Sequence, residues 1–286
     1  MTLIASTFRF AALATCLALS SMTPMANAED LSGGAVTAIG RGQAVPRFIA
    51  GLEPERIGPR KLQINPGSVA DSAGTALYRV PELDIDLDHV GVGGIDRPEL
   101  RNGTSYQVYL VRQKQSGAIG ALISPAITYG EVQLPPEFML VRKLMFGFVY
   151  DETRFGGIPT FHHAYGAKGL ITFTGADTSE NWIAVRKGQA GSFAEVDLSK
   201  WLPDAARLAR VLCITSSIGM PGKAYLRSTG AQNVGIQVGA VGSDPSVELS
   251  FETDIRVTST RGLFFRTTGG ARLTIIVLGY SMTEPS

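Results

Sequence analysis

The chain has few of the residues that would cross-link it or bind a metal. It contains 2 cysteines and 3 histidines among 286 residues, and one cysteine, Cys16, falls in the apolar leader of the chain. With Cys213 as the remaining thiol, an internal disulfide is excluded, so the hydrophobic core alone must stabilise the fold. We interpret Cys213, within the apolar run 208–214, as a buried small hydrophobe, with an intermolecular disulfide as the alternative.

Catalytic and nucleotide-binding motifs are also missing. The sequence has no Ser-His-Asp order with an elbow motif, no H-E-x-x-H and no Cys-His pairing. The glycine-rich stretch 91–94 lacks the spacing and the strand-to-helix setting of a nucleotide loop. We therefore predict that the protein is not an enzyme, assign no catalytic residue, and expect no metal site and no cofactor.

Charge is low and evenly balanced. Charged residues make up 18% of the chain, and no basic tract stands out, which argues against nucleic-acid binding. There is no amphipathic helix with a Lys/Arg face of the kind that binds membrane surfaces. Beyond the leader, no apolar stretch is long enough for a transmembrane helix, so we expect no membrane insertion.

The first 28 residues have the pattern of a secretion signal. Arg9 is their one charged residue, the apolar run 8–19 follows it, and Ala26-Asn27-Ala28 is a small-residue cleavage site. Cleavage there leaves 25 basic and 25 acidic residues, a formal net charge of zero. We predict a protein exported to the periplasm or the cell exterior. A mis-assigned start codon, with the protein carried in a virion, is the alternative.

The rest of the chain has the pattern of an all-β protein. All 33 glycines and all the prolines except Pro24 lie in this part, where they punctuate short apolar or alternating runs. The spacing of these runs suits one or two jelly-roll-like antiparallel β-sandwiches with little helix. The predicted strands are Leu62–Asn65, Ala76–Val80, Leu83–Val90, Ser105–Arg112, Ile119–Ser124, Phe138–Tyr150, Gly169–Phe173, Trp182–Arg186, Ala194–Leu198, Leu208–Ser216, Ala224–Arg227, Val234–Val238, Ser246–Val257, Leu263–Thr267 and Arg272–Tyr280.

The predicted strands group into two β-sandwiches. We place the first at 59–154 and the second at 169–286, with a linker at 155–168. Residues 29–58, dotted with Gly and Pro, are interpreted as an extended arm or linker, with an N-terminal strand pair as the alternative. Residues 202–212 have some helical character after Pro203, but the β-type residues at 211–215 favour a strand. We expect Trp201 to fill the core.

Several short motifs carry a family resemblance. They are Gly93-Gly94-Ile95-Asp96, Tyr106-Gln107-Val108-Tyr109-Leu110, Ala121-Leu122-Ile123-Ser124, Leu134-Pro135-Pro136 with 140–144, Ala194–Leu198 through Ala205, and the closing 276–280. Together they look like a module of phage tail fibres and related virion appendages, over roughly residues 58–280. The resemblance implies a non-enzymatic β-rich module, often oligomeric, that holds or presents a receptor-binding surface. Virion proteins normally lack a secretion signal, so the leader departs from the family.

One aromatic segment is a candidate for sugar binding. Rings beside imidazoles and glycines in 155–165 form a possible stacking platform, since an apolar ring face packs on a pyranose. The residues we single out are Phe161, His162, Tyr165 and Trp182. The alternative is a packed linker between the two sandwiches.

Two acidic patterns are candidates for metal binding or for glycoside cleavage. Asp84, Asp86 and Asp88 share one strand face, where alternate carboxylates lie too far apart to converge on Ca²⁺, so we interpret them as a solvated face. Glu252 and Asp254 also share a face, at a separation near the range that glycoside cleavage needs. Asp151, Glu152 and Glu248 are looser candidates for that chemistry.

The sequence therefore leaves three functions open. The preferred one is an exported structural or adhesive β-sandwich protein that self-associates, for example as a trimer, or joins other appendage proteins, and grips a surface glycan. The second is a lectin-like monomer that binds carbohydrate. The third is a polysaccharide hydrolase.

Overall fold

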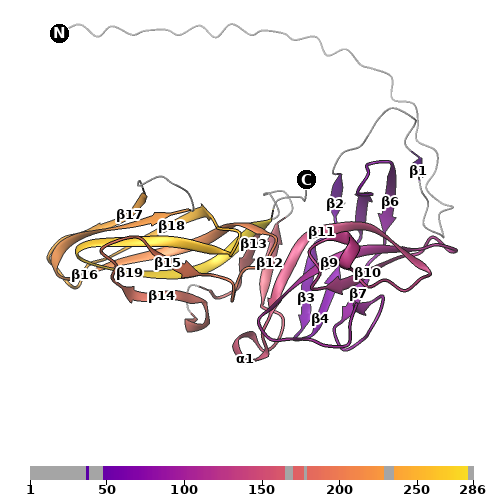
Figure 1. Ribbon diagram of the computed structural model, residues 1–286, viewed down its shortest axis with the longest axis horizontal. Helices are drawn as coiled ribbons and strands as arrows, with labels where there is room; N and C mark the ends of the chain where they lie inside the picture. Colours follow the sequence, from indigo (N-terminus) through magenta and orange to yellow (C-terminus); the bar gives the residue numbers. More distant parts are fainter. Residues whose placement is uncertain (1–36, 39–47, 165–169, 177–178, 229–234, 283–286) are drawn as a thin grey trace, which may run out of the picture. The chain divides into compact units, whose positions relative to one another are not determined.

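The computed structural model describes residues 37–38, 48–164, 170–176, 179–228 and 235–282 (Figure 1). The predicted signal at 1–28 lies outside them. The described chain is built mostly from β-strands in several sheets, which are antiparallel apart from one strand pair. This confirms the all-β prediction, while the jelly-roll connectivity stays a prediction. No helix in this part of the chain is long and apolar enough to cross a membrane.

The first part of the described chain forms three sheets. Their strand orders are β1-β6-β5-β2, β3-β4-β7 and β11-β9-β10-β8, and the one parallel pair is β8 with β10. The elements are β1 (Thr37–Ala38), β2 (Ile49–Gly51), β3 (Pro54–Gly58), β4 (Lys61–Ile64), β5 (Gly67–Ala70), β6 (Ala76–Val80), β7 (Leu83–Asp86), β8 (Gly94–Ile95), β9 (Thr104–Gln113), β10 (Ile119–Ser124), the 3₁₀ turn η1 (Tyr129–Glu131) and β11 (Phe138–Tyr150).

Three of these strands, β1, β2 and β3, fall in the stretch 29–58 that the sequence predicts as an arm or linker, and β1 pairs with β6. β2 pairs with β5, and β3 pairs with β4. Leu52, between them, is fully buried. Residues 49–58 are thus part of the sheets, in agreement with the alternative of a strand pair, because buried apolar side chains hold this stretch against the core.

β9 is the central strand of its sheet and is buried on both faces. It pairs with β10 on one side and β11 on the other. Tyr106, Val108 and Leu110 are buried on one face, and Gln107, Tyr109 and Val111 on the other. Since successive residues of a strand point to opposite faces, both faces of β9 must be covered by other elements.

The second part of the described chain forms one large sheet. Its strand order is β12-β13-β19-β16-β17, with β14 and β15 also paired to β19 and β18 paired to β16. The elements are α1 (Glu152–Phe155), β12 (Phe161–Ala164), β13 (Leu170–Phe173), the 3₁₀ turn η2 (Glu180–Trp182), β14 (Ile183–Gly188), β15 (Ala194–Asp197), β16 (Ala206–Arg227), β17 (Ile236–Val241), β18 (Glu248–Arg256) and β19 (Gly262–Met282).

The long strands β16 and β19 lie side by side and bend together (Figure 1). Their register shifts between Ser217 and Gly222. Glycines make the bend possible: Gly269 has φ +57°, and a Cβ on it would lie 2.1 Å from the carbonyl oxygen of Pro221. Gly239 of β17 lies close against Thr215 of β16: a Cβ on Gly239 would be 2.1 Å from Oγ1 of Thr215. This close approach shows that the sheet folds back on itself, and glycine is the residue that leaves room for it.

The structure resolves the ambiguity at 202–212. β16 begins at Ala206, so the strand prediction is confirmed, and no helix forms there. Trp201 is 6% exposed and Cys213 is fully buried, as expected for a core ring and a small hydrophobe. Burial raises the pKa of the Cys213 thiol to about 12, which leaves it protonated at neutral pH.

A continuous set of buried apolar side chains links the two parts of the described chain. Ser105 Oγ on β9 accepts a hydrogen bond from the backbone N–H of Asp204, at 2.9 Å. The buried Tyr280 hydroxyl on β19 donates to the carbonyl of Gly147 on β11. The division into two sandwiches stays a prediction, and the predicted linker contains β12, which pairs with β13.

Candidate functional site

Trp182, predicted to bind a sugar, is packed inside the protein. It is 5% exposed. Its ring stacks between Phe155, with ring centroids 4.6 Å apart, and Phe173, at 4.0 Å. Offset stacking of this kind stabilises a core, and both ring faces are already occupied.

The other three predicted sugar-binding residues have different surroundings. Phe161 is 7% exposed and packs against Phe146, with ring centroids 4.8 Å apart. His162 is exposed on β12, and Tyr165 lies outside the described residues. The structure thus does not bring the three described residues, Phe161, His162 and Trp182, together on an open surface. Whether they bind a glycan stays a prediction, and the buried rings favour the alternative of a packed linker.

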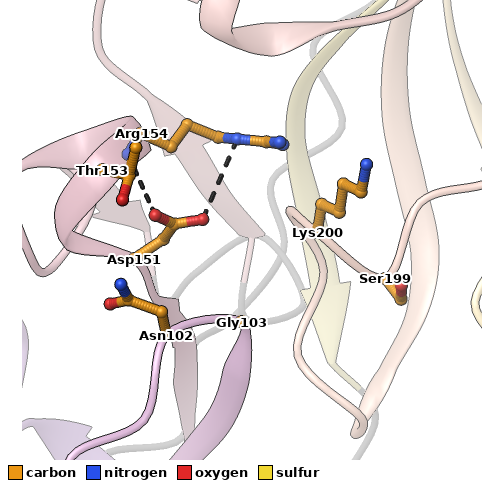
Figure 2. A pocket seen from close by; sticks show the side chains of 7 residues that line it. All are labelled: Asn102, Gly103, Asp151, Thr153, Arg154, Ser199 and Lys200. Carbon is orange, nitrogen blue, oxygen red and sulfur yellow. Dashed lines mark hydrogen bonds and ion pairs between the residues drawn. The ribbon is translucent and has the colours of Figure 1, made fainter.

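A polar cleft of ≈ 280 Å³ lies elsewhere. Three segments contribute to it: the turn before β9, the helix α1 with its N-cap, and the loop between β15 and β16. Figure 2 shows Asp151 and Arg154 on one side and Ser199 and Lys200 on the other. The lining residues are Asn102, Gly103, Asp151, Thr153, Arg154, Ser199 and Lys200.

A tight turn forms the floor of the cleft beside β9. Gly103 has φ +74°, a conformation that favours glycine. Its N–H donates to the carbonyl of Tyr150 at 2.8 Å, and the N–H of Thr104 donates to the carbonyl of Arg101 at 3.2 Å. The Asn102-Gly103-Thr104 triplet is therefore a turn in front of a strand, and the Asn102 side chain accepts from the backbone N–H of Glu152 at 3.0 Å.

The single turn of helix α1 is held by caps at both ends. The Asp151 carboxylate accepts from the backbone N–H of Arg154 at 2.9 Å. Gly156, with φ +67°, ends the helix in the left-handed conformation. The sequence contains this capping pattern, an Asp followed five residues later by Gly, although from the sequence alone we place the end of the first sandwich at 154 and the start of a linker at 155.

Arg154 is held by an aromatic ring and a carboxylate. Its guanidinium lies over the Trp201 ring, 4.9 Å from the centroid, and its Nε is 4.0 Å from Asp151 Oδ2. Within the described part of the chain, its buried Nη1 has no hydrogen-bond partner. A buried N–H without an acceptor costs about 1–3 kcal/mol.

The loop between β15 and β16 holds the opposite wall in place. The backbone N–H of Ser199 donates to the Asp197 carboxylate at 2.7 Å. Burial is the largest single effect on the pKa of Asp197 and raises it, but the hydrogen bonds from Ser199 and nearby cations together lower the pKa below its ordinary value. The indole Nε1 of Trp201 donates to the carbonyl of Asn181 at 2.7 Å. Lys200, between them, is exposed. Its ammonium group is therefore in contact with solvent and is not part of the core.

The cleft has the chemistry of a site for a polar, anionic ligand. Two of its side chains are cations, Arg154 and Lys200, and one is a carboxylate, Asp151, already engaged as a helix cap. The hydroxyls of Thr153 and Ser199 add donors and acceptors. A guanidinium held on an aromatic face is well placed to bind a carboxylate with two hydrogen bonds.

The acidic residue beside the cleft is tied up in an ion pair. Glu152 pairs with Arg60 and accepts from the Tyr150 hydroxyl at 2.8 Å. The hydrogen bond from Arg60 is the main reason why the pKa of Glu152 lies below its usual range. A general acid for glycoside cleavage needs the opposite shift.

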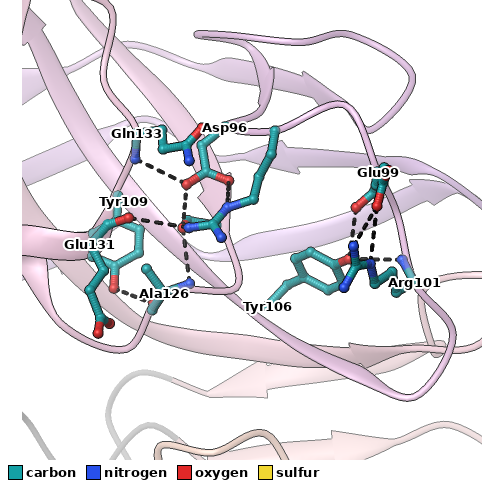
Figure 3. Close-up of polar contacts among 10 residues, drawn as sticks. Asp96, Glu99, Arg101, Tyr106, Tyr109, Ala126, Glu131 and Gln133 are labelled. Carbon is teal, nitrogen blue, oxygen red and sulfur yellow. Dashed lines mark hydrogen bonds and ion pairs between the residues drawn. The ribbon is translucent and has the colours of Figure 1, made fainter.

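A second polar cluster surrounds Asp96 of the Gly-Gly-Ile-Asp motif (Figure 3). The buried Asp96 carboxylate accepts from Ser124 Oγ at 2.6 Å and from the N–H of Gln133 at 3.2 Å, and Arg97 Nε is 3.4 Å away. The Tyr109 hydroxyl donates to the carbonyl of Ala126 at 2.7 Å. These bonds fasten the loop after β10, so we assign the motif a structural role.

Four of the remaining acidic candidates also have cationic partners. Glu252 and Asp254 on β18 both face Arg210, with Nε at 2.5 and 3.9 Å, so the prediction that they share a face is confirmed. Asp86 pairs with Lys61 at 2.9 Å and Asp88 with Arg60 at 2.6 Å. Among the described residues, no group of three potential ligands is placed to hold a metal ion.

Lys143 is a buried cation that the sequence pattern did not single out. It is 5% exposed, and its amine donates to the carbonyl of Ile127 at 3.2 Å. Burial lowers the pKa of this amine to about 8. It faces Tyr109 rather than the cleft.

No protein-family model matches the chain, and no curated protein matches it either. The resemblance to phage appendage modules therefore stays a prediction from the sequence.

Proposed function

We propose that this protein is an exported, non-enzymatic β-rich module that binds an acidic surface glycan through the polar cleft. The observation that carries the proposal is Arg154. Its guanidinium lies over the Trp201 ring, and the exposed Lys200 lines the same cleft. A saccharide that bears a carboxylate would supply acceptors to both cations and would use its hydroxyls on Ser199 and Thr153.

The absence of an enzymatic role is part of the proposal. Each described carboxyl group whose pKa departs from its ordinary value is shifted downward, at Asp71, Asp86, Glu99, Glu152, Asp197 and Asp244. Carboxylates held ionised in this way suit hydrogen bonding and ion pairing better than proton donation. The sequence resemblance to phage appendage modules, and the leader that suggests export, agree with a structural or adhesive role.

Binding to an array of bacterial surface glycans tests this function. We expect a saturable signal on a narrow set of acidic glycans, and loss of that signal when the carboxyl groups of the same glycan are reduced to alcohols. Lys200→Gln and Arg154→Lys should each weaken binding about tenfold, the loss of one charge-assisted hydrogen bond. Arg79→Gln, a change at an exposed arginine of β6, is the matched control and should bind normally.

A blank array from folded protein would contradict glycan recognition and leave a purely structural role. Equal binding to the intact and the carboxyl-reduced glycan would contradict the assignment of the two cations. Release of reducing ends from a bound polysaccharide would contradict the non-enzymatic role.

A further inference from the structure

The outer side of β18 is an exposed sheet edge. Among the described strands, β18 pairs with β16 alone, through nine rungs from Leu208 opposite Arg256 to Ser216 opposite Glu248. On the outer side of an edge strand, every second residue presents backbone N–H and C=O groups without a strand partner. Such an edge is able to accept another strand.

Large apolar side chains lie along this edge. Leu249 and Phe251 are each 43% exposed. They lie opposite Thr215 and Cys213 of β16, which are fully buried. Because residues directly opposite in an antiparallel pair point to the same face, Leu249 and Phe251 extend the core side of the sheet to its edge without being covered.

The usual protections of an edge strand are weak here. β18 contains no proline and no lysine, which commonly block the addition of a further strand. Arg210 faces both Glu252 and Asp254 and balances the charge of one of these two carboxylates. The other two charged residues of the strand, Glu248 and Arg256, lie at its two ends.

These end charges make the edge complementary to itself. When two copies of β18 pair antiparallel over all nine residues, the two-fold axis passes through Glu252, the middle of the strand. Glu248 of each copy then lies opposite Arg256 of the other, and Leu249 lies opposite Ile255. The two Glu252 side chains meet at the axis, each with its own Arg210 beside it.

We propose that β18 is a self-association edge, where a second copy of this chain adds its own β18 in this two-fold antiparallel register. The paired strands would continue the sheet from one copy into the other and would cover Leu249 and Phe251 of both copies. This goes beyond the glycan cleft, which shares no residue with β18.

Charge reversal tests the register. Light scattering over a concentration series of the full chain should show reversible approach to twice the monomer mass. Glu248→Arg and Arg256→Glu should each weaken the dimer about tenfold or more, since each places like charges opposite one another at two symmetric rungs. The double variant should restore the dimer, and an equimolar mixture of the two single variants should pair with each other.

An apolar variant and a control complete the test. Phe251→Ser should abolish the dimer while the circular dichroism spectrum is retained, because Phe251 is at the surface of the monomer. Arg79→Glu, the same charge change on the distant strand β6, should leave it intact. A chain that stays monomeric, a trimer, or a dimer that survives both charge reversals and Phe251→Ser would each overturn the proposal.

Discussion

β9 and β18 are both nine- or ten-residue strands with alternating side chains, yet the protein uses them in different ways. β9 pairs on both sides, and its six central residues are buried on both faces. β18 pairs on one side among the described strands, and its apolar residues Leu249 and Phe251 remain partly exposed. An alternating pattern thus forms a strand whether or not its apolar side chains become buried. The exposed apolar side chains of β18 are available for contact with another molecule.

A buried ring far from the edge should show the largest effect. Trp182→Ala removes a ring stacked between Phe155 and Phe173, and we expect it to lower the free energy of unfolding by about 3–5 kcal/mol. Urea unfolding followed by circular dichroism measures this. If the variant kept its stability but no longer bound the glycan, the result would show that Trp182 binds the glycan and does not stabilise the core.

A matched pair of leucines tests the comparison directly. Leu110→Ala on β9 leaves a cavity at a fully buried position, and we expect a loss of about 2–5 kcal/mol. Leu249→Ala on β18, measured at concentrations where the chain is monomeric, should cost less than about 1 kcal/mol because the side chain is already partly in water. Equal losses in the two variants would show that β18 is covered in the monomer.

Lys143, opposite Tyr109 of β9, gives this buried region a pH dependence. Its folded pKa of about 8 lies below the ordinary 10.5, so between pH 8 and 10.5 the unfolded state binds more protons and stability rises with pH. Below pH 8 the buried charge costs about 3 kcal/mol. Lys143→Met should therefore be more stable than the wild type by about that amount at pH 7, and the difference should vanish near pH 10.5.

Comparing the two proteins at each pH cancels the titration of other groups, such as Cys213, which opposes the trend above pH 9. A difference that is the same at pH 7 and pH 10.5 would show that the Lys143 amine is not desolvated.

The smallest effect belongs to a charge on the exposed strand. Glu252→Gln removes the partner of Arg210, and both side chains are partly exposed. Pairs of this kind contribute about 0–1 kcal/mol, so we expect a change within about 0.5 kcal/mol. The same variant removes a carboxylate that the hydrolase alternative needs, so loss of reducing-end release from a polysaccharide would revive that alternative.

Much of the strand pattern follows from the sequence. Ile119–Ser124 and Phe138–Tyr150 were predicted with the bounds that the structure has, because local alternation and proline corners mark them. β16 and β19 were each predicted as two strands. The glycines at 219, 222, 269 and 270 predict an end to each strand. In the fold they instead permit a bend at which β16 and β19 remain paired.

The cleft was not predictable in the same way. Its residues come from a turn, a helix and a loop, and roughly fifty residues of sequence separate each from the next. These three segments come together only when β9, β11 and β16 pack against one another. The sequence did contain local signals, namely the Asn-Gly-Thr turn and the Asp and Gly caps of α1. Nothing in it showed that Arg154 would lie over Trp201.

The most direct test of the proposed function is a titration of the protein and its Lys200→Gln variant with one acidic glycan taken from the array. The account predicts saturable binding to the wild type, about tenfold weaker binding to the variant, and none to the carboxyl-reduced glycan. Binding of equal strength in all three cases, or no binding to any acidic glycan, would contradict it.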